Sequence, residues 1–160
     1  MVIDFRGLNS QVIPNEFPLP RQEDILQSLT GSQWLSMLDA LAGFTQLKIS
    51  VEDKEKTAFR THHGLFQFLR MPFGFQNGLA VFQRVMQNVL SPFLWIFTLV
   101  YIDDIVIFSK TFEEHLSHIN KVLRAILKSG ITSSPQKCHF GYAARLEGIK
   151  TRTIDPQGKY

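Results

Sequence analysis

The stretch LVYIDDIVIF, residues 99–108, places two adjacent aspartates, Asp103 and Asp104, between two apolar runs rich in β-branched residues. Such runs are typical of buried strands, so the stretch predicts a β-hairpin with the carboxylates at its tip. A solvent-exposed turn is the ordinary alternative, because Asp suits turns for backbone reasons alone. The apolar flanks favour the centre of a sheet, where two ionised carboxylates repel each other and lose hydration. A divalent cation would relieve that repulsion, and Mg²⁺ prefers carboxylate and phosphate oxygens at ~2.0–2.1 Å.

A third acid, Asp39, ends the apolar run WLSMLD, residues 34–39. Strand alternation puts it on the same face as Leu35 and Met37. An acid in this position is the expected partner of the Asp103 pair across a sheet, although spacing alone does not show that they meet. Two metal ions held by such a cluster can activate a hydroxyl, stabilise the transition state of phosphoryl transfer and neutralise the leaving pyrophosphate.

Hydrophobic periodicity predicts helices and strands without the regular strand–helix–strand alternation of parallel sheets. The order therefore predicts an α+β fold, with helices packed on one face of an antiparallel sheet. The expected elements are helices over 21–31, 79–90 and 111–130, strands over 34–39 and 44–49, a strand pair over 57–61 and 65–69, and the hairpin strands 97–102 and 105–108.

Local signals define the ends of two of these helices. Asn77 is the expected N-cap of the helix over 79–90. Thr111 and Glu114 form a capping box at the start of the last helix, and Gly130 is its expected end. His115 and His118 lie three residues apart on that helix and could bind a metal, but a solvated helix face is the more common setting and is expected here.

Composition narrows the class of protein. The chain has 160 residues, of which 44% are hydrophobic and 19% are charged, and a net charge of +3. These values are typical of globular proteins. The longest apolar run, over 93–102, is shorter than the ~20 residues of a membrane span, so no membrane partner is expected. A single cysteine, Cys138, excludes an internal disulfide and favours an intracellular compartment, whether cytoplasm or nucleus. The small positive charge supports a nucleic-acid partner only weakly.

The residues around Asp103 resemble the Tyr-x-Asp-Asp box of reverse transcriptases, and further similar blocks follow the order of that family. These blocks are DFRGLN 4–9, FPLP 17–20, Leu38-Asp39 with Gly43-Phe44, KTAF 56–59, RMPFG 70–74, Phe82-Gln83 and KCHF 137–140. Together they look like the polymerase of gypsy-type LTR retrotransposons. The resemblance implies a right-hand palm with part of the fingers over residues 1–142, and template-directed DNA synthesis.

The same resemblance implies roles for individual residues. Asp39, Asp103 and Asp104 match the catalytic carboxylates and would hold two Mg²⁺ ions, for which Mn²⁺ is a substitute. The positions that match nucleotide-binding residues are Phe44, Phe73, Gly74 and Tyr101, and Gln83 matches a residue under the template or primer. Lys137 is a further, weaker candidate for binding the triphosphate of the nucleotide. Phe44 would stack beneath the incoming sugar and exclude a 2′-hydroxyl, with ordinary core packing as its alternative. The implied partners are an RNA or DNA template with its primer, and deoxynucleoside triphosphates.

The sequence also departs from that family. FQNGL, residues 75–79, stands where Leu-x-Asn-Ala-Pro is usual, and residues 143–160 form a divergent tail where the family has an apolar strand that grips the primer. Basic finger residues would precede Met1, and thumb, RNase H and integrase regions would follow Tyr160. A second hypothesis is therefore a catalytically silent remnant of a decayed element that at most binds nucleic acid.

Overall fold

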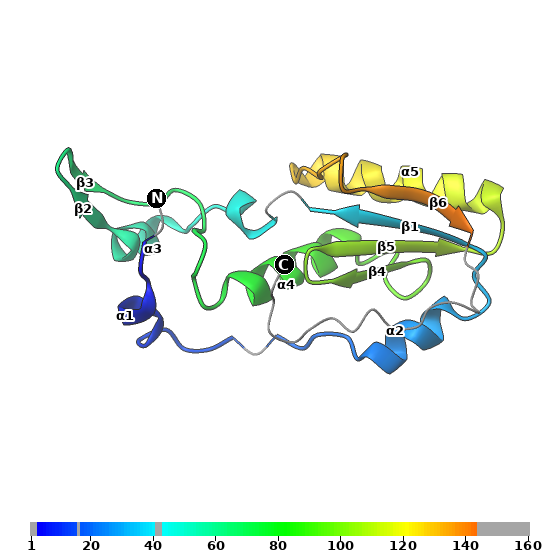
Figure 1. Ribbon diagram of the computed structural model, residues 1–160, viewed down its shortest axis with the longest axis horizontal. Coiled ribbons are helices and arrows are strands. Elements are labelled where there is room, and N and C mark those ends of the chain that lie inside the picture. Colours follow the sequence, from blue (N-terminus) through cyan, green and yellow to red (C-terminus); the bar gives the residue numbers. More distant parts are fainter. Residues whose placement is uncertain (1–2, 16, 41–42, 144–160) are drawn as a thin grey trace.

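The computed structural model describes residues 3–15, 17–40 and 43–143, with the side chain of Phe44 excepted (Figure 1). The helices α1 to α5, the 3₁₀ helices η1 and η2 and the strands β1 to β6 follow one another as α1 Arg6–Asn9, α2 Gln22–Leu29, β1 Trp34–Asp39, η1 Gly43–Gln46, α3 Val51–Lys54, η2 Glu55–Thr57, β2 Phe59–Thr61, β3 Gly64–Phe66, α4 Gly78–Leu90, β4 Thr98–Tyr101, β5 Asp104–Ser109, α5 Phe112–Ser129 and β6 His139–Ala143.

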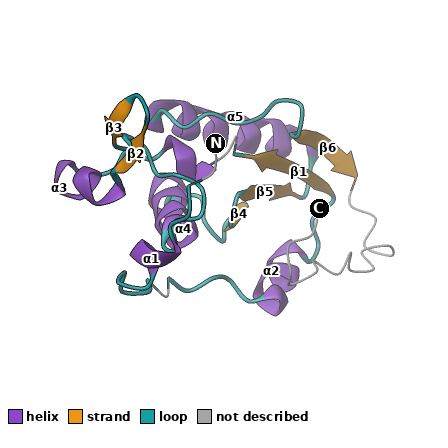
Figure 2. Cartoon of the chain, turned by 60° about the vertical axis from the view of Figure 1, so that its left-hand side comes forward, coloured by secondary structure: helices purple, strands orange, loops and turns teal. Residues whose placement is uncertain are grey.

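Four strands form one antiparallel sheet in the order β4-β5-β1-β6, and β2 and β3 form a separate hairpin at the other end of the molecule (Figure 1). Helices α4 and α5 pack against one face of the larger sheet and against each other. This arrangement confirms the expected α+β fold with helices on one face of an antiparallel sheet. Figure 2 shows the same layers from the side, with α1 and α2 away from the α5 side of the sheet.

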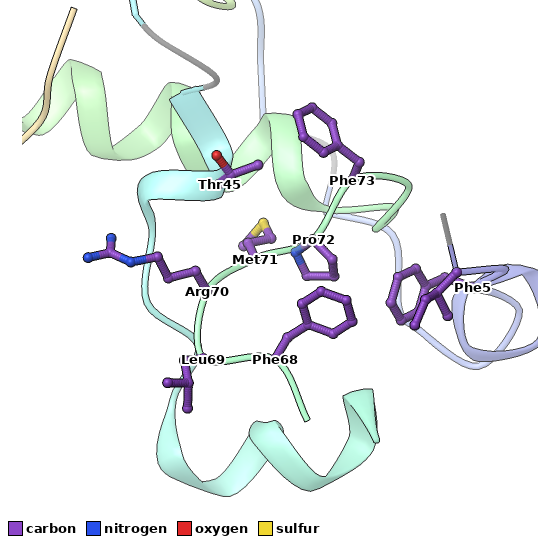
Figure 3. A pocket seen from close by; sticks show the side chains of 9 residues that line it. Phe5, Thr45, Phe68, Leu69, Arg70, Met71, Pro72 and Phe73 are labelled. Atoms are coloured by element: carbon purple, nitrogen blue, oxygen red, sulfur yellow. The ribbon is translucent and has the colours of Figure 1, made fainter. Parts of the chain in front are cut away.

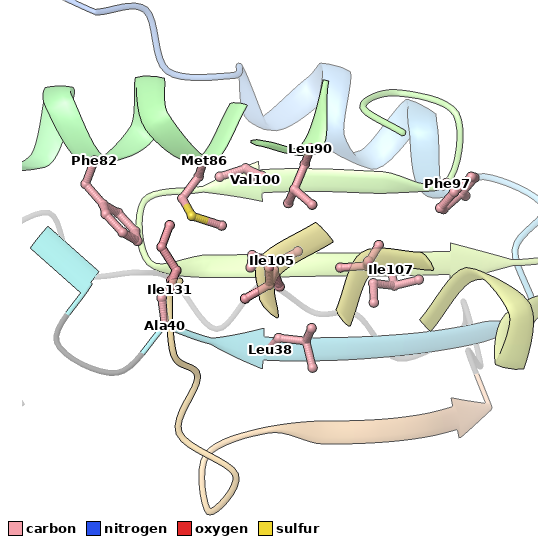
Figure 4. Close-up of a cluster of buried hydrophobic side chains, with 12 residues drawn as sticks. Leu38, Ala40, Phe82, Met86, Leu90, Phe97, Val100, Ile105, Ile107 and Ile131 are labelled. Atoms are coloured by element: carbon pink, nitrogen blue, oxygen red, sulfur yellow. The ribbon is translucent and has the colours of Figure 1, made fainter. Parts of the chain in front are cut away.

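The apolar core lies between that sheet face and the two helices (Figure 4). Strand alternation explains its composition, because Leu38 and Ile107 point toward the helices and are fully buried, whereas Met37 points the other way and is 42% exposed. Burial of each such aliphatic or aromatic side chain contributes about 1.5–3 kcal/mol. The fully buried residues that α4 and α5 contribute to this core are Phe82, Met86, Leu90 and Val122.

The predicted helix ends are confirmed at α5 and corrected at α4. Thr111 accepts from the backbone N–H of Glu114, the side chain of Glu114 accepts from Thr111 N–H, and Gly130 adopts the left-handed conformation that ends α5. Asn77 precedes α4 but makes no side-chain cap. Its amide accepts from Asn15 N–H at 2.9 Å and donates to the carbonyl of Ile13 at 2.9 Å, so it ties the N-terminal segment to α4 instead.

The strand expected over 44–49 is wrong. Residues 43–46 form η1, and Lys48 makes only an isolated bridge with Arg70. Both edges of β1 are already occupied, by β5 and β6, so no edge of β1 is free to take a further strand. Gln46 instead accepts at its side-chain oxygen from the backbone N–H and hydroxyl of Thr132, which fixes η1 to the loop after α5.

The remaining strands differ from expectation in their bounds. The hairpin β2–β3 turns at His62-His63, between the two predicted strands, but its strands are shorter than predicted. Strand β6 was not expected; it pairs with β1 and forms one outer edge of the sheet. The divergent tail expected over 143–160 lies outside the described residues beyond Ala143. In the described part of the chain, no helix has the length and hydropathy needed to span a membrane.

Candidate active site

Two of the three aspartates lie side by side on the sheet face opposite α4 and α5. Asp39, at the end of β1, is directly opposite Asp104, which begins β5, and Tyr101 of β4 is opposite Asp104 on the other side. Residues opposite one another in antiparallel strands share a face, so the three side chains form one row across the sheet. The expected association of Asp39 with the aspartate pair is therefore confirmed in the fold.

The hairpin tip differs by one residue from the predicted one. Ile102 and Asp103 form the two-residue turn, and Asp104 is already paired within the strands. The backbone carbonyl of Asp103 accepts from the N–H of Ala40 at 3.1 Å, so the turn is also attached to the end of β1. Asp103 is thereby held next to the row formed by Asp39 and Asp104.

The turn has an unusual backbone conformation. Ile102 has φ +57°, the first central position of a turn of the type II′ kind, where glycine is usual. A left-handed conformation is strained for a β-branched residue, and such strain is found where the surrounding structure over-determines it.

Gln83 of α4 supplies part of that support. Its side chain is fully buried, donates to the carbonyl of Val100 at 2.9 Å and accepts from the N–H of Ile102 at 2.8 Å. Gln83 thus bonds to the backbone on both sides of Tyr101. The template or primer contact expected of Gln83 stays a prediction, and its side chain has no exposed surface here.

Burial and crowding perturb the acids. The pKa of Asp103 is raised, first by burial and then by the charges of Asp39 and Asp104. The pKa of Asp104 is raised by burial and by Asp39. Lys137 acts in the opposite direction on both. Oδ1 of Asp103 is buried and has no hydrogen-bond partner. The site therefore lacks positive charge for the number of carboxylates it contains.

The donor chemistry fits a divalent cation such as Mg²⁺, because three carboxylates are hard oxygen ligands and one buried oxygen is without a partner. In the part of the chain that the structure describes, however, no three His, Cys, Asp or Glu side chains converge closely enough to hold an ion as they stand. Binding of one ion by all three of Asp39, Asp103 and Asp104 would need their side chains to turn toward one another.

A basic side chain lies over the same row. The ammonium of Lys137 is 3.6 Å from Oδ2 of Asp39, and its side chain is 68% exposed. The loop that carries Lys137 is attached to the end of β1, since Ser134 N–H donates to the carbonyl of Asp39 at 3.0 Å and Ser133 bridges Ala40. The structure thus brings this predicted nucleotide-binding residue to the carboxylates.

The 3₁₀ helix η1 packs tightly against the site. A Cβ atom on Gly43 would lie 2.5 Å from Cζ of Phe82 and 3.0 Å from Oδ1 of Asp103, so only glycine fits this position. The backbone of Phe44 follows in η1, and its side chain lies outside the described residues. The expected role of Phe44 stays a prediction.

Two other predicted nucleotide-binding residues, Phe73 and Gly74, lie in the segment before α4. Phe73 is 61% exposed and lines an apolar pocket of about 540 Å³ between η1 and the residues around Phe5 (Figure 3). Thr45 of η1 lines the same pocket, so η1 connects it with the carboxylates. Gly74 has φ +84°, and its carbonyl accepts from the side chain of Asn9 at 2.8 Å.

The histidines of α5 correct one expectation. His115 is fully buried, whereas a solvated face was expected. Its Nε2 is 2.7 Å from Oγ of Ser36 in β1, and its Nδ1 is 2.9 Å from Oγ of Ser109 in β5, which also contacts Nδ1 of His118 at 2.8 Å. The available sequence signal was spacing, because His115 lies 7 and 11 residues before the buried Val122 and Ile126.

Known proteins are similar to this chain in both sequence and fold. The family described as "Reverse transcriptase (RNA-dependent DNA polymerase)" matches residues 1–156. The Retrovirus-related Pol polyprotein from transposon 297 of Drosophila melanogaster is 39% identical over 96% of this chain, which spans 15% of that polyprotein. An RNA-directed DNA polymerase homolog of Oenothera berteroana is 40% identical over 76% of this chain and 88% of its own length.

Among solved structures, the foamy viral protease–reverse transcriptase in complex with RNA/DNA hybrid superimposes with a TM-score of 0.76 and 28% identity. The match covers 87% of this chain and 19% of that one. A second foamy viral structure, in complex with ds DNA, gives a TM-score of 0.79, also at 28% identity, and covers 89% of this chain and 25% of that one.

Proposed function

The chain belongs to the reverse transcriptase family, and from this membership we propose that Asp39, Asp103 and Asp104 form the nucleotidyl-transfer site of a gypsy-type retrotransposon polymerase. Family and fold support RNA-directed DNA synthesis in general terms. The observation that carries the specific proposal is the register that places Asp39 opposite Asp104, with Asp103 in the adjoining turn.

The proposed reaction joins a primer 3′-hydroxyl to a deoxynucleoside triphosphate on an RNA or DNA template. Two Mg²⁺ ions, when bound, would supply the positive charge that lowers the pKa of the hydroxyl and neutralises the leaving pyrophosphate. The carboxylates would hold these ions, and the raised pKa values of Asp103 and Asp104 support a site that gains from added positive charge.

The same proposal assigns the nucleotide to the region where η1, the segment before α4 and the turn meet. Tyr101 is in the row of the carboxylates, Lys137 is next to Asp39, and Phe73 lines the pocket beyond η1. We propose that these residues, with Phe44 and Gly74, contact the triphosphate and sugar. The template and primer would lie on the sheet face opposite α4 and α5.

Single-nucleotide incorporation on a primed RNA and a primed DNA template, at low salt with Mg²⁺ or Mn²⁺, tests the assignment. We expect slow incorporation, because misplacement of substrates costs ~10²-fold in rate and the chain spans only 15% of its transposon relative. Asp103→Asn should abolish incorporation, and Asp24→Asn, an exposed carboxylate on α2, should retain it. Incorporation that survives Asp103→Asn would contradict the proposed site, and a wild-type chain without incorporation would favour the silent remnant.

Sugar selection tests the role of Phe44 separately. In a longer protein that also carries the rest of the polymerase, Phe44→Ala should admit ribonucleotides while deoxynucleotide use is largely kept, because truncation of the ring opens space for a 2′-hydroxyl. The measurement is the ratio of incorporation rates for the two sugars. An unchanged ratio would leave Phe44 as a packing residue.

A further inference from the structure

Lys137 stands out because it is a cation in a cluster of acids and yet is mostly exposed. Its Nζ lies 3.6 Å from Oδ2 of Asp39, whose side chain is 23% exposed. Among the described residues, it is the one cation within ion-pair distance of Asp39, Asp103 or Asp104. Its charge also favours the ionised forms of Asp103 and Asp104.

Hydrogen bonds hold the backbone of Lys137 in place, whereas its side chain is mostly exposed. Lys137 N–H donates to the carbonyl of Ser134 at 3.1 Å, and Ser134 N–H donates to the carbonyl of Asp39 at 3.0 Å. These bonds connect the loop to the very residue with which Lys137 pairs. A lysine side chain has a flexible four-carbon stem, so from this fixed point the ammonium can move away from Asp39 without any change in the backbone.

A divalent cation and this ammonium need the same oxygens. Oδ2 of Asp39 carries the ion pair here, and Asp39 is also one of the proposed metal ligands. Like charges at such a distance repel, so both cannot keep full contact with Asp39. The Lys137 side chain is mostly exposed, and ion pairs made by exposed side chains are weak, so we treat this contact as exchangeable rather than fixed.

We propose that Lys137 is an exchangeable counter-ion of the active site. It pairs with Asp39 while no metal is bound, and it gives up Asp39 when a divalent cation binds there. The cluster then never carries three uncompensated charges, and the released ammonium becomes available to phosphate oxygens only once a metal is in place. This inference rests on the proposed function, because it takes Asp39 as a metal ligand.

Mn²⁺ binding to the purified chain, measured by calorimetry, tests the exchange without any need for activity. Lys137→Met should bind Mn²⁺ about twofold to fivefold more tightly than the wild type, because a competing cation is removed. Lys137→Arg should keep the wild-type affinity. Lys128→Met, an exposed lysine in the last turn of α5, is the matched control and should also keep it. Affinity that is unchanged or weaker in Lys137→Met would overturn the proposal.

A spectroscopic readout follows the ammonium itself. Reductive ¹³C-methylation keeps the lysine charge, and the Lys137 signal is identified by its loss in Lys137→Met. Addition of Mg²⁺ should shift this signal toward that of exposed lysines in the wild type, and the shift should be absent in Asp39→Asn. A Lys137 signal that stays in place while Mg²⁺ binds would refute the exchange.

The two proposals fail in different ways. If the wild type shows no Mn²⁺ binding that Asp103→Asn removes, the metal site of the proposed function is wrong, and the exchange is wrong with it. If the wild type binds Mn²⁺ and Lys137→Met binds it equally well, only the exchange is wrong, and the metal site stands.

Discussion

Ile102 occupies a backbone conformation that an isoleucine rarely adopts, and the neighbouring side chains explain how it is held. Its φ of +57° places Asp103 beside the row of Asp39 and Asp104, and Gln83 bonds to the backbone on both sides of Tyr101. The fold therefore accepts local strain at the residue that determines where a carboxylate lies.

A pair of substitutions at Ile102 measures this strain. At an ordinary position, Gly is less stable than Ala by roughly 0.5–1 kcal/mol. At Ile102 the order should reverse, with Ile102→Gly more stable than Ile102→Ala by about 1 kcal/mol, because only glycine adopts a positive φ without a steric cost. Urea unfolding of both variants gives the difference, and the usual order of stability would show that the turn is unstrained.

Loss of the Gln83 amide should be costly. Gln83→Leu leaves the buried carbonyl of Val100 and the partly buried N–H of Ile102 without partners, so we expect a loss of about 2–4 kcal/mol in the free energy of unfolding. Gln87→Leu, one turn along α4 and only partly buried, is the control and should change stability little. Equal effects of the two substitutions in urea unfolding would argue against a supporting role for Gln83.

At the scale of elements, α5 is joined to the sheet by polar contacts as well as by its apolar stripe. His115 reaches Ser36 of β1 and Ser109 of β5, and the ring of His118 stacks on Phe97 at 3.8 Å between centroids. Oγ of Ser36 also accepts from Gly141 N–H at 3.0 Å, where the register between β1 and β6 shifts. One buried network thus connects α5 with three strands.

This network makes stability depend on pH. The pKa of His115 is lowered by burial and by His118, and that of His118 is lowered by burial and by Lys121. Below about pH 6.5 the histidines of the unfolded chain bind protons, while those of the folded chain, with their lowered pKa values, stay neutral. The free energy of unfolding is therefore highest above this pH and declines below it until the folded histidines also bind protons.

Thermal melts at pH 7.5 and pH 5.5 test this. We expect His115→Gln to lose less stability than the wild type between these two values, although it is less stable at both. His62→Gln, in the exposed turn between β2 and β3, should keep the wild-type dependence on pH. The same pH dependence in His115→Gln as in the wild type would show that His115 is not the group responsible.

At the scale of the whole molecule, the carboxylates and the apolar core lie on opposite faces of one sheet. Leu38 and Ile105 point toward α4 and α5, whereas Asp39 and Asp104, their neighbours in sequence, point away. Folding and the proposed chemistry thus depend on alternate residues of the same strands, and the charges are a cost to the fold rather than a support for it.

Asp103→Asn should therefore stabilise the metal-free chain at pH 7, by on the order of 1 kcal/mol, because it removes a crowded charge. Since the folded pKa values of Asp103 and Asp104 are raised, the wild type gains stability as the pH falls from neutral through these pKa values, and the variant should gain less. Mg²⁺ should raise the melting temperature of the wild type but not that of Asp103→Asn. A Mg²⁺ effect of equal size on both would contradict metal binding at this site.

The sequence predicts some parts of this fold well because their causes are local. The ends of α5 follow from Thr111, Glu114 and Gly130, which act within one turn of the helix. The face of Asp39 follows from alternation within a single strand. The pairing of Asp39 with Asp104 rather than Asp103 depends on the register between β1 and β5, which alternation within one strand does not determine.

Other parts depend on partners that are distant in sequence. The run over 44–49 was expected to be a strand, but neighbours already occupy both edges of β1, and η1 forms over residues 43–46 instead. Gln83 and His115 are polar residues within apolar helix faces. Gln83 bonds to Val100, 17 residues away, and His115 bonds to Ser36, 79 residues away. Most residues of strand β6 are exposed, and the strand is defined by its pairing with β1. None of these partners could be identified from periodicity.

The separation of the carboxylates from the core also has a consequence for the gene that encodes this chain, and for the order in which mutations remove its functions. Under the proposed function, a copy of the element that loses the codon for one of these aspartates still encodes every buried apolar side chain of the core, so we expect its product to fold. Selection for a folded product alone cannot preserve the acids. Under the proposed function, the presence of Asp39, Asp103 and Asp104 together therefore reflects selection for catalysis, which the fold alone does not report.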